Sequence, residues 1–191
     1  MLIVLLAGCT GMRDAQQFAA PAHAYGNEQK IAELSAAITA LGDRVDPAEA
    51  LQAAEVAVRY PLKLAEQYEL TTPPLWHNTL VNLGIKPRGL CVDWTRDLLV
   101  RLRELRLSTL KTHWGVANSE AAFLIEHSTA IITVRGESME TGIVLDPWRN
   151  SGRLFWSRIS EDTKYQWHPL AEVQAKRRLK QAARAEFTSS R

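Results

Sequence analysis

The sequence predicts an α+β domain in which helices come first and an antiparallel sheet follows. Apolar residues recur at helical spacing from residue 28 to about residue 107, whereas residues 112 to 159 contain runs of β-branched and apolar residues. The two patterns do not alternate as βαβ units would require. With 191 residues, 46% of them apolar, the chain is long enough for one domain with its own hydrophobic core.

The first two expected helices have recognisable ends. Residues 28–41 carry apolar side chains at helical spacing, and Gly42 is a typical C-terminal stop. Asp46-Pro47 predicts an N-cap followed by proline in the first turn of a second helix. That helix continues to about residue 70 if Pro61 only kinks it, and otherwise ends before that proline.

Two further helices are expected before the sheet. The third begins at Thr72-Pro73-Pro74 and ends at Gly84, and its buried side is expected to contain Leu75, Leu80, Val81 and Leu83. The fourth follows Gly89, which permits a tight turn. Cys91 is thus expected at or near a helix N-terminus, where unpaired N–H groups and the helix dipole stabilise a thiolate. A lone cysteine is more often a small buried apolar residue, so other groups must decide its role.

Residues 112–118 and 121–134 are expected to form strands, because β-branched and apolar residues dominate both. Residues 135–142 have the composition of a hairpin loop, and residues 143–146 form the next strand before Pro147. Residues 154–159 are expected to form another strand or an extended edge segment. Residues 171–187 predict a terminal helix with a basic face, which we interpret as a solvated surface, with weak attraction to anionic lipid as the alternative.

The N-terminus predicts export and lipid attachment. Leu6-Ala7-Gly8-Cys9 follows a short apolar run and resembles the bacterial lipobox, in which the cysteine becomes the acylated first residue. The organisation expected from this is a signal peptide at 1–8, a tether at 9–27 and a single domain at 28–191. The protein would then be anchored in the bacterial envelope, at the periplasmic face of the outer membrane in a Gram-negative cell.

Acylation of Cys9 would leave Cys91 without a disulfide partner, because the chain has two cysteines. A lone free thiol in an oxidising compartment is unusual without a use, which favours a catalytic role for Cys91. The overall charge of +2 gives no indication of a nucleic-acid partner.

Cysteine-based acyl transfer needs a base for the thiol and a group that orients the base. His127 lies inside the strand expected at 121–134, and Asp146 ends the next strand. If the hairpin is centred near Gly136–Glu137, His127 and Asp146 are directly opposite on one face of the sheet. The sequence therefore predicts a Cys91–His127–Asp146 triad.

Over roughly residues 75 to 160 the chain resembles the transglutaminase-like branch of the papain-like cysteine enzymes. Three short motifs carry this resemblance: Gly89-Leu90-Cys91, His127-Ser128-Thr129-Ala130 and Leu145-Asp146-Pro147-Trp148. The resemblance implies a peptidase, amidase or acyltransferase without a cofactor that acts on a peptide or isopeptide amide. Asp93 is a departure, because its charge close to Cys91 would oppose a thiolate.

The remaining site residues are expected around the cysteine. The backbone N–H of Cys91 and a donor from Trp76, His77 or Asn78 are candidates for the oxyanion hole. Trp94 and Trp148 are candidates for the walls of the cleft, although aromatic residues at such places more often belong to the core.

Three other functions stay open at this point. A murein endopeptidase of the related family usually has Asp-Cys-Ser, where this chain has Leu90-Cys91-Val92. A second alternative is a non-catalytic envelope binding module that uses the same fold, with an envelope protein as its partner. The third is zinc bound by the three triad residues with His113, which the absence of a close paired spacing such as Cys-x-x-Cys disfavours.

Overall fold

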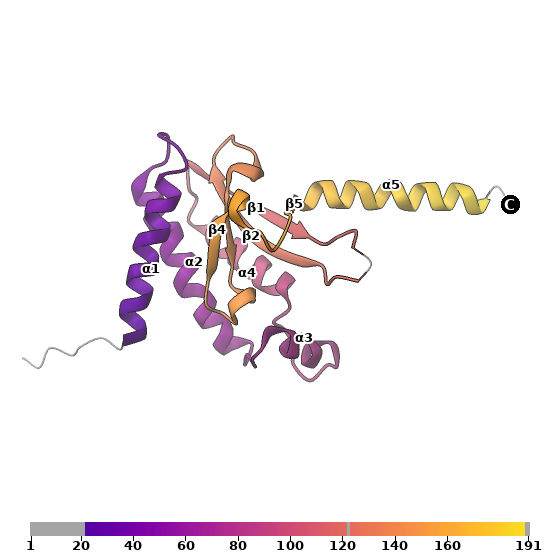
Figure 1. Ribbon diagram of the computed structural model, residues 1–191, viewed down its shortest axis with the longest axis horizontal. Coiled ribbons are helices and arrows are strands. Elements are labelled where there is room, and N and C mark those ends of the chain that lie inside the picture. The colour runs from indigo at the N-terminus through magenta and orange to yellow at the C-terminus, as the bar shows by residue number, and fades with distance from the viewer. Residues whose placement is uncertain (1–21, 122, 190–191) are drawn as a thin grey trace, which may run out of the picture.

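The computed structural model describes residues 22–121 and 123–189 and confirms the α+β class (Figure 1). Its helices are α1 (Ala22–Thr39), α2 (Pro47–Gln67), α3 (Pro74–Asn82), α4 (Cys91–Glu104) and α5 (Leu170–Ser189). Its strands are β1 (Leu110–Ala117), β2 (His127–Val134), β3 (Ile143–Asp146), β4 (Phe155–Arg158) and β5 (His168–Pro169). Three short 3₁₀ turns follow strands or loops: η1 (Met139–Thr141), η2 (Trp148–Asn150) and η3 (Ile159–Glu161).

The expected signal peptide and Cys9 lie outside the described residues, as does most of the tether expected at 9–27. The last part of that tether is helical, because α1 begins at Ala22 rather than near Glu28. Alanines in this stretch favour a helix, and Gly26 is tolerated within it. α2 runs through Pro61 without ending, and Asp46 caps it by accepting a hydrogen bond from the N–H of Ala48 at 2.8 Å.

The strands form one antiparallel sheet in the order β4-β3-β2-β1-β5. The main core lies between one face of this sheet and helices α1, α2 and α4, which Figure 1 shows as a helical layer beside the strands. A smaller apolar cluster on the other face is formed by Ala117, Ile131, Met139, Val144 and Trp167. Both faces of β2 are therefore covered, which explains why all eight of its residues are buried.

The strand predicted from residue 121 begins only at His127. The β1–β2 ladder ends at the pair Ala117 and His127, so the residues before His127 have no strand to pair with. They form a loop in which Phe123, Leu124 and Ile125 are exposed. A strand was predicted here because the loop is apolar in composition.

The buried side predicted for α3 is wrong. Leu75 and Leu83 are exposed, and the buried residues of this helix are His77 and Asn78. The helix lies at the edge of the fold, where it contacts η2 through its polar inner side. Leu80 and Val81 are only half-buried, and none of the four predicted residues belongs to a core cluster.

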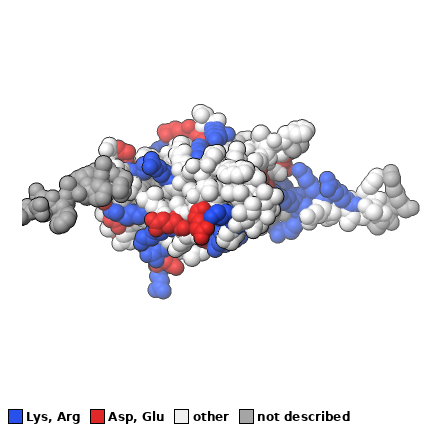
Figure 2. All heavy atoms as spheres, turned by 90° about the horizontal axis from the view of Figure 1, so that it is seen from below, with Lys and Arg blue, Asp and Glu red and all other residues white. Residues whose placement is uncertain are grey.

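α5 projects away from the rest of the molecule, and Figure 2 shows Lys and Arg side chains gathered along it. Two ion pairs connect this helix to the β1–β2 loop, Lys180 with Glu120 at 2.7 Å and Arg177 with Glu126. Among the described residues, no helix is both long enough and apolar enough to cross a membrane.

Candidate active site

Cys91 is the first residue of α4, and the turn before it is fixed by side chains of the same helix. Asp93 accepts hydrogen bonds from the backbone N–H groups of Gly89 and Leu90, both at 3.1 Å. Trp94 donates from Nε1 to the carbonyl of Gly89 at 3.0 Å. The carboxylate of Asp93 is thus turned back onto the turn and serves as a cap, which accounts for an acidic residue so close to the cysteine.

Gly89 occupies a position that only glycine fits. Its φ is +122°, and a Cβ built on it would lie 2.2 Å from His77 Nε2. We expect Gly89→Ala to lower the free energy of unfolding by about 2 to 5 kcal/mol in urea denaturation, from backbone strain and overpacking together. Gly84→Ala is the matched control: with a φ of +73° and open space around it, it should cost only about 1 to 2 kcal/mol. Equal losses in the two variants would contradict the steric conflict between a side chain at residue 89 and His77.

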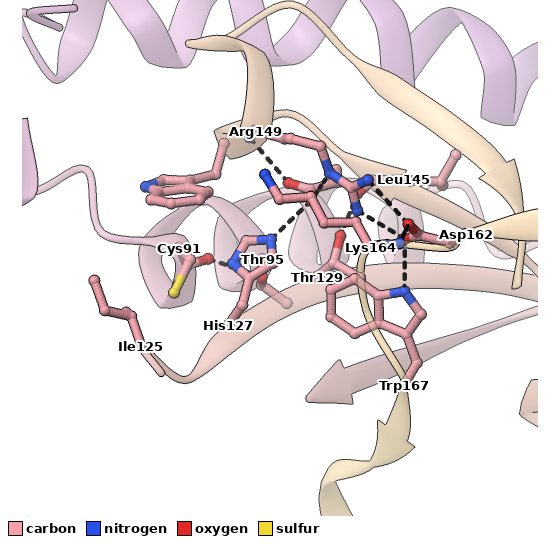
Figure 3. A network of polar contacts seen from close by, with 12 residues as sticks. Cys91, Thr95, Ile125, His127, Thr129, Leu145, Arg149, Asp162, Lys164 and Trp167 are labelled. Carbon is pink, nitrogen blue, oxygen red and sulfur yellow. Dashed lines mark hydrogen bonds and ion pairs between the residues drawn. The ribbon is translucent and has the colours of Figure 1, made fainter. Parts of the chain in front are cut away.

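His127 begins β2 and is 2% exposed. Its Nε2 is 2.7 Å from Asp146 Oδ2, whereas its Nδ1 is buried and has no hydrogen-bond partner among the described residues. Figure 3 shows Cys91 on one side of the imidazole and Arg149, Asp162 and Trp167 on the other. The sulfur of Cys91 is 3.8 Å from the carbonyl oxygen of Glu126, the residue before His127. The three residues predicted as a triad are therefore brought together at the N-terminus of α4.

The predicted register between β2 and β3 is wrong by two residues. Ala130 pairs with Leu145 and Ile132 with Ile143, so Asp146 lies opposite Thr129 and not opposite His127. The loop spans residues 135–142 as predicted and contains η1, but the pairing centres the hairpin between Glu137 and Ser138 instead of between Gly136 and Glu137. A shift of two residues preserves the face of the sheet, so His127 and Asp146 still meet as diagonal neighbours.

Aromatic rings enclose the imidazole of His127. The ring centroids of Trp148 and Tyr165 are each 4.7 Å from it, and that of Trp167 is 5.4 Å away. These rings hold the imidazole in one orientation and exclude water from the His127–Asp146 hydrogen bond.

Burial of His127 disfavours the charged imidazolium, but the hydrogen bond to Asp146 and the influence of the Cys91 side chain outweigh it. Together they raise the pKa of His127 to about 9. At neutral pH the imidazole therefore carries protons on both nitrogens. The proton on Nδ1 then needs an acceptor, and a Cys91 thiolate on that side would supply one.

This elevated pKa predicts a particular pH dependence of stability. The folded pKa lies above the unfolded value of about 6.5, so the contribution of His127 is fully present below pH 6.5 and is lost as pH rises through about 9. Urea denaturation should show a loss of up to about 3 kcal/mol over this window relative to His127→Gln. Identical pH profiles for wild type and variant would contradict the pairing.

Asp146 belongs to a buried network that continues beyond His127 (Figure 3). Its Oδ2 also accepts from Arg149 Nε at 3.0 Å, and its Oδ1 accepts from the backbone N–H of Arg149 at 3.1 Å. Arg149 in turn donates both terminal nitrogens to the Asp162 carboxylate, at 3.1 and 2.7 Å. Trp167 Nε1 donates to Asp162 at 2.9 Å, which ends the network at the smaller apolar cluster.

A cleft of about 580 Å³ opens onto Cys91 and His127. Two apolar segments line it, Pro73 to Leu75 at the start of α3 and Phe123 to Ile125 in the β1–β2 loop. Its polar lining consists of Asn118, Glu126, Arg149, Lys164 and Tyr165. The cleft is therefore apolar at two of its borders and polar near the imidazole.

The three side chains predicted for the oxyanion hole do not line this cleft. Trp76 is 52% exposed. His77 is fully buried, with Nδ1 3.2 Å from the backbone N–H of Thr71 and Nε2 2.9 Å from the carbonyl of Arg88, so it holds the turn before α4. Asn78 accepts at Oδ1 from Trp148 Nε1 at 3.1 Å and supports that ring from behind. Of the donors predicted for the oxyanion hole, the backbone N–H of Cys91 is the one that remains.

The two tryptophans expected as cleft walls have different positions. Trp148 lines the cleft and packs on His127. Trp94 is 1% exposed and lies in a cluster with Leu64 and Tyr68, so it belongs to the core. It lies one turn after Cys91 on α4, packs in the same cluster as the cysteine and does not line the cleft.

Four further residues lie at the site and were not predicted from the sequence: Arg149, Asp162, Lys164 and Tyr165. Burial and the charge of Asp146 raise the pKa of the Tyr165 phenol, as expected for a ring packed against the site. Arg149 directly follows the motif that ends at Trp148, and the other three come from the segment before β5, which carries no motif. The one available signal was the alternation of polar and aromatic residues from Lys164 to Trp167.

The zinc alternative gains no support from the arrangement of donor groups. Within the described ranges, no group of three or more His, Cys, Asp or Glu side chains is placed to hold a metal ion. His113 bonds through Nε2 to Thr133 Oγ1 at 2.8 Å and pairs across the ladder with Ile131, four residues from His127 along β2.

Comparisons with known proteins leave the family open. No family model, no curated protein and no solved structure matches the chain. The transglutaminase-like resemblance of the three motifs therefore stays a prediction from sequence.

Proposed function

We propose that the protein is a cysteine hydrolase or acyltransferase that acts on an amide bond, with Cys91 as nucleophile. The observation that carries this proposal is the buried imidazole of His127. Its Nε2 is bound to Asp146, and its Nδ1, which has no hydrogen-bond partner in the described part of the chain, lies on the side of Cys91. A base oriented by a carboxylate and directed at a thiol is the arrangement that acyl transfer by cysteine requires.

The chemistry would proceed through a thioester. The Cys91 thiolate attacks the carbonyl carbon, and the carbonyl electron pair moves onto oxygen. His127 gives the Nδ1 proton to the leaving nitrogen as the C–N bond breaks, which leaves an acyl group on sulfur and a neutral imidazole. Water, or an amine in a transferase, then gives a proton to Nδ1 and attacks the thioester. The C–S bond breaks, and the thiolate–imidazolium pair returns.

The oxyanion formed in the first step needs donors beside the sulfur. The backbone N–H of Cys91 has no intrahelical acceptor, because it belongs to the first turn of α4. It is the donor that we assign to this role, supported by the positive end of the helix dipole.

The cleft supports a peptide-like substrate with apolar side chains beside the reacting amide. Phe123 is 99% exposed and Leu124 and Leu75 are more than half exposed, although all three border a cleft that leads to Cys91. Exposed apolar side chains around a concave site are typical of surfaces that are covered by a ligand.

Envelope attachment remains part of the proposal on sequence grounds alone, from Leu6 to Cys9. Metabolic labelling with a palmitate probe should mark the full chain and not its Cys9→Ala variant. Equal labelling of the two proteins would remove the anchor from the proposal.

The function is tested by incubation with a mixture of peptides and isopeptides that differ in the residues beside the amide, with products identified by mass spectrometry. We expect cleavage or amine transfer next to apolar residues by the wild type and none by Cys91→Ala. Binding of peptides without any new product would indicate the non-catalytic module instead. Equal product formation by the Cys91→Ala variant would exclude Cys91 as nucleophile.

A further inference from the structure

The carboxylate that orients His127 is shared with a second cation. Asp146 Oδ2 accepts from His127 Nε2 at 2.7 Å and from Arg149 Nε at 3.0 Å. A simple triad needs only the first of these contacts. The second places a permanent positive charge against the atom that holds the imidazole, in a site where all three side chains are at most 9% exposed.

The arginine is itself held by a second carboxylate. Asp162 binds both terminal nitrogens of Arg149, its side chain is 2% exposed, and it receives the indole N–H of Trp167. Arg149 also lies over the rings of Phe155 and Tyr165, at 3.8 and 4.8 Å from their centroids. Burial of so many charged groups is unfavourable unless each is paired, and here each one is.

We propose that Arg149 and Asp162 are positioning residues that set the proton affinity of His127 through Asp146. The proposal depends on the proposed function only because that function gives the His127 imidazole its role as base and acid. Arg149 competes for Asp146 and repels the imidazolium, so its charge lowers the affinity of His127 for a proton. Asp162 partly neutralises Arg149 and so acts in the opposite direction.

Several charged or titratable groups face the imidazole or this network, and they come from four parts of the fold. They are Cys91 on α4, Asp146 at the end of β3, Arg149 in η2, and Asp162, Lys164 and Tyr165 before β5. Of these, Arg149 and Asp162 form the pair whose two charges can be removed one at a time or together. The direction in which each variant shifts the pKa of His127 can therefore test the proposal.

The test measures the pKa of His127 by NMR titration of the histidine Cε1–H signals, with the His127 signal identified by its absence in His127→Gln. All titrations use the full chain in a Cys91→Ala background, because a titrating thiol would be coupled to the imidazole. The readout therefore does not depend on activity, and a failure here is distinct from a failure of the proposed function.

The two single variants are expected to move the pKa of His127 in opposite directions. Arg149→Gln should raise it, and Asp162→Asn should lower it, each by about 0.5 to 1 pH unit. The double variant, which removes both charges, should return the pKa close to that of the parent. Arg149→Lys keeps the charge and should stay near the parent even if the bidentate contact with Asp162 is lost.

A merely structural role gives a different pattern. If Arg149 and Asp162 only hold Asp146 in place, every variant weakens the His127–Asp146 hydrogen bond, and the pKa of His127 falls in all of them. Shifts of the same sign in both single variants would therefore overturn the proposal, as would no shift in either. The double and Arg149→Lys variants keep the test decisive if one single variant does not fold.

Discussion

Replacing His127 by alanine is expected to lower kcat/KM for hydrolysis of 4-nitrophenyl acetate by about 10²-fold to 10³-fold. In the proposed mechanism the imidazole takes the thiol proton and later takes a proton from the water that hydrolyses the thioester, and general acid–base catalysis contributes about this much. A small activated ester reports the thiol chemistry without requiring knowledge of the natural substrate. The rate is followed by release of 4-nitrophenolate, after subtraction of the rate for Cys91→Ala.

His113→Ala is the matched control for this variant. His113 is another histidine of the sheet, half-buried where His127 is buried, and it bonds to Thr133 and lies away from Cys91. We expect His113→Ala to retain the wild-type rate within about twofold. A similar loss of rate in both variants would mean that the effect comes from disruption of the sheet and not from the site.

Replacing Asp146 by alanine is expected to have the largest effect on stability, a loss of about 3 to 5 kcal/mol in urea denaturation. The variant leaves two buried cationic groups, His127 and Arg149, without the acceptor that both share. Removal of one member of a buried charge network costs this much because the remaining charges stay uncompensated. Asp146→Asn keeps the shape and one acceptor oxygen, so it should lose less.

Asp43→Ala provides the reference for loss of an aspartate as such. Asp43 is exposed in the turn before α2, and its replacement should change the free energy of unfolding by no more than about 0.5 kcal/mol. If Asp146→Ala were as mild as Asp43→Ala, the network around Arg149 would not be the stabilising element described above.

Much of the fold could be predicted from the sequence because its signals are local. The cap at Asp46 and the turn at Gly89 mark helix starts, and the three residues of the predicted triad were chosen by residue type and order. His127 and Asp146 lie together despite the wrong predicted register, because an offset of two residues keeps both side chains on the same face of the sheet. Local chemistry was sufficient for these features.

What the sequence did not predict depends on tertiary packing. The loop from Phe123 to Ile125 looks like a strand until β1 is known to end at Ala117. Trp94 was expected at the cleft, but its side chain packs against Leu64 of α2 and belongs to the core. Arg149 and Asp162 were missed because their pairing joins two irregular segments through a bidentate contact with no sequence spacing of its own.

The central claim is that His127 activates Cys91 as a nucleophile, and the pH dependence of Cys91 alkylation by iodoacetamide tests it most directly. The wild type should react rapidly already near pH 6, where free cysteine is almost entirely protonated, and His127→Ala should lose this reactivity. A wild-type rate that follows that of free cysteine across the pH range, unchanged by His127→Ala, would contradict the claim.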